Sequence, residues 1–536
     1  MGVNARIDVS EKDLNNLHQL LTRYLPNTKV WAFGSRVKWT SRSDSDLDLV
    51  VFATKEQSRQ VHNLKDALQE SSLPFRVDVL VWDNIPDTFR ENIKQQYIVL
   101  IDLESSKEWQ SVLLGDVTNY KKCFAFKSKD YTNSGVPVIR VSNFTDNSIS
   151  PSDLKFVSLN IREANQDVQL AEHDIVIATV GSWQNNPASV VGKTITVPKW
   201  ASGALMNQNS VIIRAKSKQL VDQLFIYYQM KSSEFSNHVV SKAQGSANQA
   251  SITLDAIFSF PLYWANEDER KFIVGTLHSL DDRITLLRET NATLEAIAQA
   301  LFKSWFVDFD PVHAKMQGTQ PEGMDEQTAA LFPDSFEESE LGLVPAGWEV
   351  GTLGDIVTTA KKQLQVSNLT SEFNYVGLEH IPRKSLSLTD WGNAEGLENA
   401  KSAFSKGDIL FGKLRPYFHK VVVAPFDGVC STDILVCQPQ IPAYYGITAM
   451  LLFSTALISY AERLSNGAKM PRVNWKDLAN YPVCIPPEHL AANFTETVTP
   501  LFSLMAENVH KSQTLADLRD TLLPRLISGQ LRVGEI

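Results

Sequence analysis

Two regions of this chain repeat the same order of local patterns, 221 residues apart. One strand-like run closes at Pro261 and a second closes at Pro482, and a long amphipathic helical pattern of the same length follows each. A period of this size is far above the roughly 20–50 residues of a solenoid unit. The repeat therefore predicts two similar domains, each followed by a matching long helix.

Length and composition limit the class of protein. A chain of 536 residues is expected to form three or four domains. It has no apolar run of about 18 residues, and its polar start from Met1 to Lys12 lacks a signal-peptide core. The 4 cysteines have neither CxxC spacing nor histidines at zinc-ligand spacing. We therefore expect reduced structural thiols and a cytoplasmic location.

The net charge of −10 is concentrated in one segment. Residues 308–344 contain nine acidic residues and one lysine, whereas residues 111–265 contain 14 basic and 11 acidic residues. Residues 345–485 are also close to neutral, with 13 basic and 12 acidic residues. The total charge therefore does not exclude a nucleic-acid partner for the repeated domains.

The hydrophobic patterns divide the chain into six segments. Residues 1–105 are predicted to form a small α/β domain, with helices at Leu14–Leu21 and 57–70 and strands at 29–33, 47–53 and 76–82. The later segments are a first repeated domain at 108–265, a helix at 266–307, an acidic linker at 308–344, a second repeated domain at 345–487 and a helix at 488–536. The acidic segment has little periodicity, so we expect a linker or a loosely ordered connection.

The two repeated domains share an order of strands, turns and helices. The first is predicted to have strands at 137–141, 174–180 and 210–214, then a helix from Val221, a loop at 244–246 and a strand that ends at Pro261. In the second, Gly354-Asp355 matches Gly115-Asp116, and Asp408 matches Asp174. There a helix over about 444–464 and a loop at 466–468 precede the strand that ends at Pro482.

The two long helices carry heptad seams. Apolar residues recur at alternating steps of four and three, which is typical of helices that pair. The seam positions are Ile273, Leu277, Leu280, Ile284, Leu287, Asn291, Leu294, Ala298, Leu301 and Trp305, then Phe494, Val498, Leu501, Met505, Asn508, Ser512, Leu515, Arg519, Leu522 and Leu526. Pseudo-two-fold pairing would make the helices antiparallel, with the polar positions Asn291, Asn508 and Ser512 fixing the register. Ordinary core-facing helices are the alternative.

Two equivalent domains at a fixed separation suit a two-part linear ligand such as DNA. Candidate base-reading residues lie in matched loops of the repeats. In the first domain they are amides, which can bond adenine: Gln184, Asn185, Asn186, Gln244, Asn248 and Gln249. In the second domain most are cationic, suited to guanine or phosphate: Lys413, Arg415, Tyr417, Lys469 and Arg472. Each of these residues alone is more often a solvated loop residue.

The repeated region resembles the specificity (S) subunits of type I restriction–modification systems. The resemblance rests on GDILFGKLRPY (407–417), NATLEAIAQALFKSWF (291–306) and LRDTLLPRLISG (518–529), and it covers about 108–536. It implies two target-recognition domains, each reading half of a split double-stranded DNA site, and an antiparallel helical spacer. It also implies two methyltransferase (M) subunits that use S-adenosylmethionine, ATP-driven restriction (R) subunits, and no chemistry in the S subunit itself.

The N-terminal domain contains a second motif. Gly34-Ser35-Arg36 is followed by Asp46 and Asp48, which are two apart on a predicted strand and so face the same side. Paired carboxylates can hold a divalent cation against phosphate oxygens, and a Gly-Ser turn lets backbone N–H groups approach phosphate. Asp78, on the next strand-like run, is a candidate third ligand.

This motif resembles the minimal nucleotidyltransferases of the DNA polymerase β superfamily, including those that act as antitoxins. The resemblance implies Mg²⁺-dependent transfer of a nucleotide from ATP or a similar donor. It gives Gly34 and Ser35 a phosphate-binding role, assisted by Arg36, and makes Asp46, Asp48 and Asp78 the metal ligands and catalytic carboxylates. The chain departs from the family at Trp39, where a small residue is usual, and we expect this bulky side chain to crowd the turn.

The predicted fold class is α+β multidomain: two repeated α/β target-recognition domains, an antiparallel coiled coil and a small nucleotidyltransferase-like domain. Three functions fit. The first is a DNA specificity subunit with an added N-terminal module, and the second is a nucleotidyltransferase that the DNA-binding region targets. The third is a scaffold, without DNA, built on the coiled coil. The N-terminal domain is either an enzyme or an inactive docking module.

Overall fold

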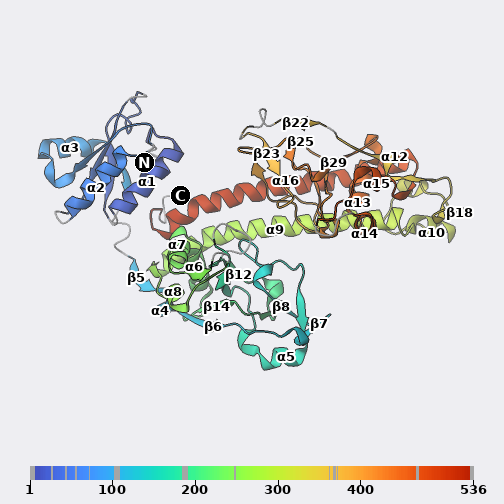
Figure 1. Cartoon of the computed structure of the whole chain (residues 1–536), viewed down its shortest axis with the longest axis horizontal. Coiled ribbons are helices and arrows are strands. Elements are labelled where there is room, and N and C mark those ends of the chain that lie inside the picture. The colour runs from blue at the N-terminus through green and yellow to red at the C-terminus, as the bar shows by residue number, and fades with distance from the viewer. Residues whose placement is uncertain are drawn as a thin grey trace. The chain divides into compact units, whose positions relative to one another are not determined.

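The computed structural model describes residues 7–25, 28–42, 45–54, 57–71, 73–101, 109–183, 191–246, 249–360, 362–365, 370, 372–465 and 470–531. The chain is a mixed α+β structure and forms two compact units (Figure 1). One contains Met1–His278 with Asp520–Ile536, and the other contains Ser279–Arg519. No single described helix is long and apolar enough to cross a membrane, although the helix pair Pro442–Phe453 and Thr455–Leu464, bent by 63°, passes the same test when combined.

The N-terminal domain is a four-stranded sheet with helices on both faces. The strand order is β3 (Val77–Val81), β2 (Leu47–Val51), β1 (Val30–Phe33) and β4 (Ile98–Ile101), with β2 and β3 parallel and the other pairs antiparallel. Apolar residues of α1 (Glu11–Tyr24) and α2 (Ser58–Gln69) pack on one face, and Ile93 of α3 (Asp87–Gln95) packs on the other. The helices and strands predicted for this domain are confirmed, with ends shifted by a few residues.

The first repeated domain contains two four-stranded sheets and three short helices near its end. The sheets have the orders β12-β10-β14-β6 and β13-β8-β9-β7. Their strands are β6 (Thr118–Lys122), β7 (Tyr131–Thr132), β8 (Val136–Ile139), β9 (Lys155–Val157), β10 (Ile175–Ala178), β12 (Thr194–Thr196), β13 (Leu205–Met206) and β14 (Ser210–Ala215). The helices are α4 (Leu114–Val117), α5 (Leu159–Ala164), α6 (Leu220–Met230), α7 (Ser233–Ser241) and α8 (Leu254–Phe258). The strands expected at 137–141, 174–180 and 210–214 are therefore present.

The second repeated domain also contains two main sheets, one of four strands and one of five. Its sheets are β21-β29-β26-β27 and β22-β25-β28-β23-β24. The strands are β21 (Val357–Thr359), β22 (Gln363–Leu364), β23 (Asn374–Val376), β24 (Gly392–Asn393), β25 (Lys401–Phe404), β26 (Ile409–Gly412), β27 (Val421–Val423), β28 (Gly428–Cys430) and β29 (Ile434–Pro439). The helices are α12 (Leu353–Ile356), α13 (Tyr445–Phe453), α14 (Thr455–Leu464) and α15 (Trp475–Leu478). The single helix expected over 444–464 is wrong: it breaks at Ser454, whose side chain caps α14 by accepting a hydrogen bond from Leu457 N.

Matched acidic residues shape equivalent turns in both repeats. Asp174 accepts a hydrogen bond from Ala171 N, and Asp408 accepts one from Ser405 N, both at 2.8 Å. Asp174 also pairs with Arg214, whereas Asp408 accepts from Gln438 Nε2. The matched aspartates therefore have a structural role in the turns before β10 and β26.

The predicted strand ends at Pro261 and Pro482 are wrong in the same way. A short helix precedes each proline, α8 in the first repeat and α15 in the second, and the strand begins at the proline. These strands are β17 (Pro261–Trp264), paired with β5 (Gln110–Leu113), and β30 (Pro482–Ile485), paired with β20 (Glu349–Thr352). Proline is tolerated at the first residue of a strand, and Thr253 caps α8 through Ala256 N. An apolar run of this length suits a short helix as well as a strand.

The long helices are α9 (Glu267–Phe306) and α16 (Glu488–Ile527), each of 40 residues. In the unit Ser279–Arg519 they make three contacts in opposite order: Arg519 pairs with Asp281, Asn508 donates to Asn291, and Phe494 lies 6.2 Å from Phe302 between ring centroids. The two segments are therefore antiparallel there. In the other unit, Ile273, Leu277, Leu526 and Ile527 share one buried cluster with the first repeated domain.

The acidic segment 308–344 is folded, so the expectation of a loosely ordered connection is wrong. It contains α10 (Asp310–Met316), α11 (Glu326–Ala330) and a hairpin of β18 (Phe336–Ser339) with β19 (Gly342–Pro345). Val312 and Phe332 are buried in the same core as Trp305 of α9. Sparse apolar residues hold this segment in place while its acids remain on the surface.

Candidate nucleic-acid interface and nucleotide site

In the N-terminal domain, the turn after β1 brings the backbone of Gly34 close to the Asp48 carboxylate. Gly34 has a φ of +86°, and a Cβ added there would lie 2.1 Å from Asp48 Oδ2. The left-handed backbone and the close carboxylate both require glycine at this position. Lys38 N donates to Gly34 O at 3.2 Å, and Thr40 N donates to Ser35 O at 3.1 Å, which closes the turn.

The candidate carboxylates influence one another. Asp48 and Asp78 are partners in the parallel pairing of β2 with β3, so their side chains leave the same face of the sheet. Burial raises the pKa of Asp48, and the negative charges of Asp78 and Asp46 raise it further. Asp46 lies just before β2, which begins at Leu47, and not on the strand as we expected.

The carboxylate oxygens of these aspartates are the type of ligand that Mg²⁺ prefers, and a bound cation would relieve the repulsion between the carboxylates. Their spacing supports the site less well. Among the described residues, no three His, Cys, Asp or Glu side chains are gathered closely enough to hold a metal ion, and Arg76 Nε lies 3.5 Å from Asp78 Oδ1.

Arg36 has a structural role that the sequence did not reveal. Its side chain is only 7% exposed and stacks on Phe75, with 4.4 Å from Cζ to the ring centroid. Its Nη1 donates to Asp8 O at 2.7 Å, and its Nε and Nη2 donate to Ser45 O. These bonds tie the turn to neighbouring backbone and occupy donors that a phosphate-assisting arginine would use.

Trp39 does not crowd the turn, contrary to our expectation. The residue has a φ of +55° and its side chain is 62% exposed. The left-handed backbone explains why a small residue suits this position. The indole lines an open pocket of about 520 Å³ together with Asp8, Asp13, Arg36 and Arg42.

In the first repeated domain, two of the candidate amide segments lie together. β11 (Val180–Gly181) pairs with β16 (Gln249–Ser251), which forms a hairpin with β15 (Gln244–Ser246). Gln244 and Gln249 are both exposed on this small sheet. The other predicted residues, Gln184, Asn185, Asn186 and Asn248, lie outside the described residues. The residues on either side of 184–190 are described, and there Val191 N donates to Ser182 O at 3.0 Å, next to β11.

The second repeated domain brings its candidate cations together in the matching place. Leu414 forms an antiparallel bridge with Arg472, Arg415 N donates to Pro471 O at 2.7 Å, and Val473 N donates to Lys413 O at 3.1 Å. Tyr417 is exposed, and Arg472 forms a 3.0 Å ion pair with Asp433. The remaining candidate, Lys469, lies outside the described part of the chain.

Sequence reasoning missed three cations beside this surface. Arg383 stacks over Phe418, which contacts Tyr417, and the positive charge of Arg383 lowers the pKa of Lys420, although burial of Lys420 is the larger cause. Lys384 N donates to His419 O at 2.9 Å. The only local signal was an Arg-Lys pair some 30 residues before the candidate loop, and this says nothing about which residues it contacts.

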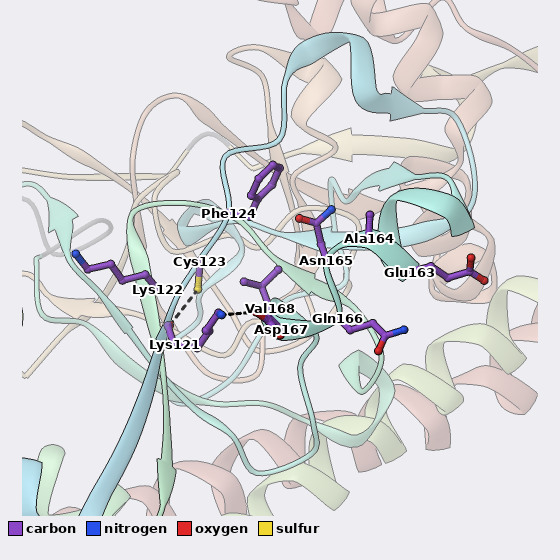
Figure 2. A pocket seen from close by; sticks show the side chains of 10 residues that line it. All are labelled: Lys121, Lys122, Cys123, Phe124, Glu163, Ala164, Asn165, Gln166, Asp167 and Val168. Carbon is purple, nitrogen blue, oxygen red and sulfur yellow. Dashed lines mark hydrogen bonds and ion pairs between the residues drawn. The ribbon is translucent and has the colours of Figure 1, made fainter.

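A pocket of about 460 Å³ lies beside β6 in the first domain and is shown in Figure 2. Its lining joins Lys121, Lys122 and Phe124 to residues 163–168. The Lys121 ammonium pairs with Asp167, and burial raises the pKa of the Cys123 thiol to about 11. A paired lysine and a protonated thiol give this pocket no activated nucleophile.

Family comparisons agree with the division of the chain. The family model described as "Type I restriction modification DNA specificity domain" matches residues 106–296 and 345–490. This match covers more than half of the chain, which therefore belongs to the type I restriction–modification DNA specificity family. A model described as "Polymerase beta, Nucleotidyltransferase" matches residues 15–106.

Two relatives match the two regions of the chain, and one solved structure overlaps much of its length. The HindI specificity subunit of Haemophilus influenzae is 22% identical over 495 residues, or 79% of this chain and 100% of that protein. A probable protein adenylyltransferase, MntA, of the same organism is 36% identical over 110 residues, or 20% of this chain and 96% of that protein. The crystal structure of the type I S subunit from M. genitalium overlaps 78% of this chain and 96% of its own at 15% identity, with a TM-score of 0.43.

Proposed function

We propose that this chain is the DNA specificity subunit of a type I restriction–modification system and recognises a bipartite double-stranded site. One observation carries the proposal: both repeated domains build their candidate surface at the same place. Gly181 pairs with Ala250 in the first domain, and Leu414 bridges to Arg472 in the second. Two equivalent surfaces on one chain match two half-sites on one duplex.

The chemistry of the two surfaces differs, which suits two different half-sites. Gln244 and Gln249 present amides, which bond adenine bidentately in the major groove. Arg415 and Arg472 can bond guanine or phosphate, and Lys413 adds a phosphate contact. Gln184, Asn185, Asn186, Asn248 and Lys469 remain candidate DNA-contacting residues in this proposal.

The long helices form the spacer in this proposal, as an antiparallel coiled coil. The contacts Asp281–Arg519 and Asn291–Asn508 support antiparallel pairing, and the buried Asn pair suits a device that fixes the register. A helix of 40 residues spans about 60 Å at 1.5 Å per residue. We infer that this length sets the gap between the half-sites.

The partners follow from the family. We infer two M subunits, which bring S-adenosylmethionine, and R subunits, which bring ATP hydrolysis, in the cytoplasm. The specificity region itself then binds and positions DNA and has no cofactor of its own. The two repeated halves of the chain would present equivalent surfaces, and we infer two M subunits for this reason.

Selection from randomised duplexes by the full chain with its M subunits tests this function. We expect two blocks of preferred bases separated by a fixed number of unselected ones. Arg415→Ala should relax one block by about 1–3 kcal/mol, and Gln249→Ala should affect the other block only. A selection that enriches no split motif would contradict the proposal.

A second function is proposed for residues 1–105, namely nucleotide transfer from ATP. The fit of Gly34 against the Asp48 carboxylate supports it, because this geometry serves a phosphate-binding turn beside a metal-binding carboxylate. Mg²⁺ would supply charge neutralisation of the phosphates. Asp48 would bind the ion beside the turn, Asp78 and Asp46 would add negative charge that attracts it, and the backbone N–H groups of Gly34 and Ser35 would orient the phosphates. Arg36 would maintain the turn.

Incubation of the complex with labelled ATP and Mg²⁺ tests the second function. We expect label on a protein or nucleic-acid acceptor, abolished in Asp46→Ala/Asp48→Ala. Arg42→Ala, an exposed cation of the same domain, serves as the control. Label transfer that persists in the double variant would reject these carboxylates as its source, and absence of transfer in the wild type would favour an inactive docking module.

A further inference from the structure

Arg383 is exposed on the second repeated domain and stacks on an aromatic ring. Its guanidinium carbon lies 3.9 Å from the centroid of the Phe418 ring, and Phe418 contacts the exposed Tyr417 at 4.6 Å between centroids. Among the residues that the structure describes, none accepts a hydrogen bond from the Arg383 guanidinium. Stacking favours one placement of the guanidinium and leaves its five donors available to a ligand.

The surroundings of Arg383 are rich in positive charge. Lys384 is exposed, and the pKa of Lys420 is lowered by burial and then by Arg383. The nearby Glu379 acts in the opposite direction on Lys420 but does not outweigh these causes. Cations held close to one another are stabilised when a polyanion binds, because the anion removes their mutual repulsion.

The segment that carries Arg383 and Lys384 is hydrogen-bonded to α9. Leu386 N donates to Glu295 Oε2 at 2.7 Å, and Ser385 Oγ donates to the same atom at 3.3 Å. Asn291 Nδ2 donates to Ser387 Oγ at 3.3 Å. Glu295 is 7% exposed, and Gln299 Nε2 donates to its other oxygen at 3.1 Å. We call residues 383–387 the anchored segment.

The anchored segment is also fixed to the domain itself. Val423 N donates to Leu386 O at 3.0 Å, and Lys384 N donates to His419 O. Lys384 has a φ of +53°. A left-handed lysine costs about 1 kcal/mol or more and persists only when its surroundings impose it. The anchored segment therefore has one conformation, set jointly by α9 and by residues 418–423.

We propose that Arg383 contacts DNA in the half-site of the second repeated domain, and that Glu295 is the positioning residue that holds Arg383 in register with the spacer helix. The ligand group is a guanine edge or a backbone phosphate, which share the acceptor chemistry that a planar guanidinium bonds. The inference rests on the proposed DNA-recognition function. It adds a reading residue outside both loops that the sequence indicates, and it links that residue mechanically to α9.

Duplex selection and salt-dependent binding by the full complex test the proposal in Arg383→Ala, Arg383→Lys, Glu295→Ala and Glu295→Gln. We expect Arg383→Ala to weaken binding by roughly 5- to 150-fold, the effect of one arginine contact. If the contact is to guanine, the block that Arg415→Ala relaxes also relaxes. If it is to phosphate, all sequences weaken and the log–log salt slope falls by about one.

The Glu295 variants separate positioning from folding. Glu295→Ala should reproduce the effect of Arg383→Ala, on the second domain's block if the contact is to guanine, or on overall affinity and salt slope if it is to phosphate. Glu295→Gln, which keeps an acceptor for Leu386 N, should bind as the wild type does. The base preference of the first domain's block should change in neither variant. Lys406→Ala, an exposed cation at the opposite end of β26 from Lys413, is the matched control for loss of charge.

Two results would overturn the proposal. Arg383→Ala with unchanged affinity, salt slope and selected blocks would reject the DNA contact, while wild-type selection still upheld the general function. Glu295→Ala whose effect differs in kind from that of Arg383→Ala, or that was not rescued by Glu295→Gln, would reject positioning. A wild-type complex that selects no sequence would overturn the DNA function and this inference together.

Discussion

A buried ion pair anchors the first repeated domain to the start of its long helix. Arg270 Nε lies 2.8 Å from Asp222 Oδ1, its Nη1 donates to Ala265 O at 2.5 Å, and its guanidinium stacks on Trp264. Both charged side chains are nearly excluded from solvent. Removing one partner would leave the other as an unpaired buried charge, which costs about 3–5 kcal/mol. We therefore predict that Arg270→Ala strongly destabilises this part of the domain.

In the second repeat the contact at the matching place is uncharged, and this suggests a variant that should restore stability. There the carbonyl that precedes the long helix, Pro486 O, accepts from Tyr444 Oη at 2.8 Å, and the position that matches Arg270 is Ala491, fully buried. The double variant Asp222→Leu/Arg270→Met likewise removes both charges, and it replaces them with apolar side chains of similar volume. It should recover most of the lost stability, since replacing a buried ion pair by a well-packed neutral contact is often close to neutral.

Hydrogen exchange of the amides of α6 and of the first turns of α9 is the assay, because a chain of several domains does not unfold in one step. A cost of 3–5 kcal/mol corresponds to more than about 100-fold faster exchange there in Arg270→Ala. Amides of the second domain should be unaffected. Acceleration of less than tenfold, or a double variant no better than the single one, would refute the reasoning.

Three further predictions concern other parts of the chain. Gly34→Ala should abolish nucleotide labelling while Ser35→Ala only weakens it, because a Cβ at 34 would overlap the Asp48 carboxylate; equal labelling of Gly34→Ala and wild type would contradict this. Burial raises the pKa of Glu295 above its ordinary 4.5, so its contribution to stability is present below about pH 4.5 and is lost as the pH rises through the folded-state pKa. Glu295→Gln should therefore gain thermal stability relative to wild type as the pH is raised above 4.5, and a difference in melting temperature that does not change with pH would contradict this. Deleting one heptad from each long helix should shorten the half-site gap by about three base pairs, since seven residues rise about 10.5 Å and a base pair about 3.4 Å; methylation mapping that returns the original spacing would reject the ruler.

Periodicity predicted the parts of this fold that depend on local sequence. The heptad seams placed Asn291 and Asn508 on facing helices, and the two side chains bond at 2.9 Å. The matched Gly-Asp pairs likewise marked equivalent helix starts, where Asp116 and Asp355 accept hydrogen bonds from the backbone of Leu113 and Thr352. These features follow from spacing along the chain and need no knowledge of distant contacts.

Errors arose where tertiary contacts decide the outcome. The runs before Pro261 and Pro482 are short helices because they pack beside α4 and α12 at the base of each domain, as the hydrogen bond from Gly354 N to Ala479 O illustrates. The segment 308–344 folds because Val312 and Phe332 enter a core built from distant elements. Neither contact leaves a periodic signal in its own segment.

The candidate site shows the same division. The loops around Arg415 and Arg472 were predictable, because they occupy matched positions in a repeat, and the structure brings them together. Arg383 and the role of Arg36 were not predictable, since they depend on Phe418 and on the backbone of Asp8 and Ser45. A cation's function is set by what it contacts, and those contacts are distant in sequence.

Methylation mapping of DNA from cells with and without this chain, with the M subunits present in both, tests the central claim most directly. We expect methylated adenines at one bipartite motif only when the chain is present, with Arg415→Ala relaxing one half of that motif. An identical methylation pattern in both cells, or a motif that is not split, would contradict the account.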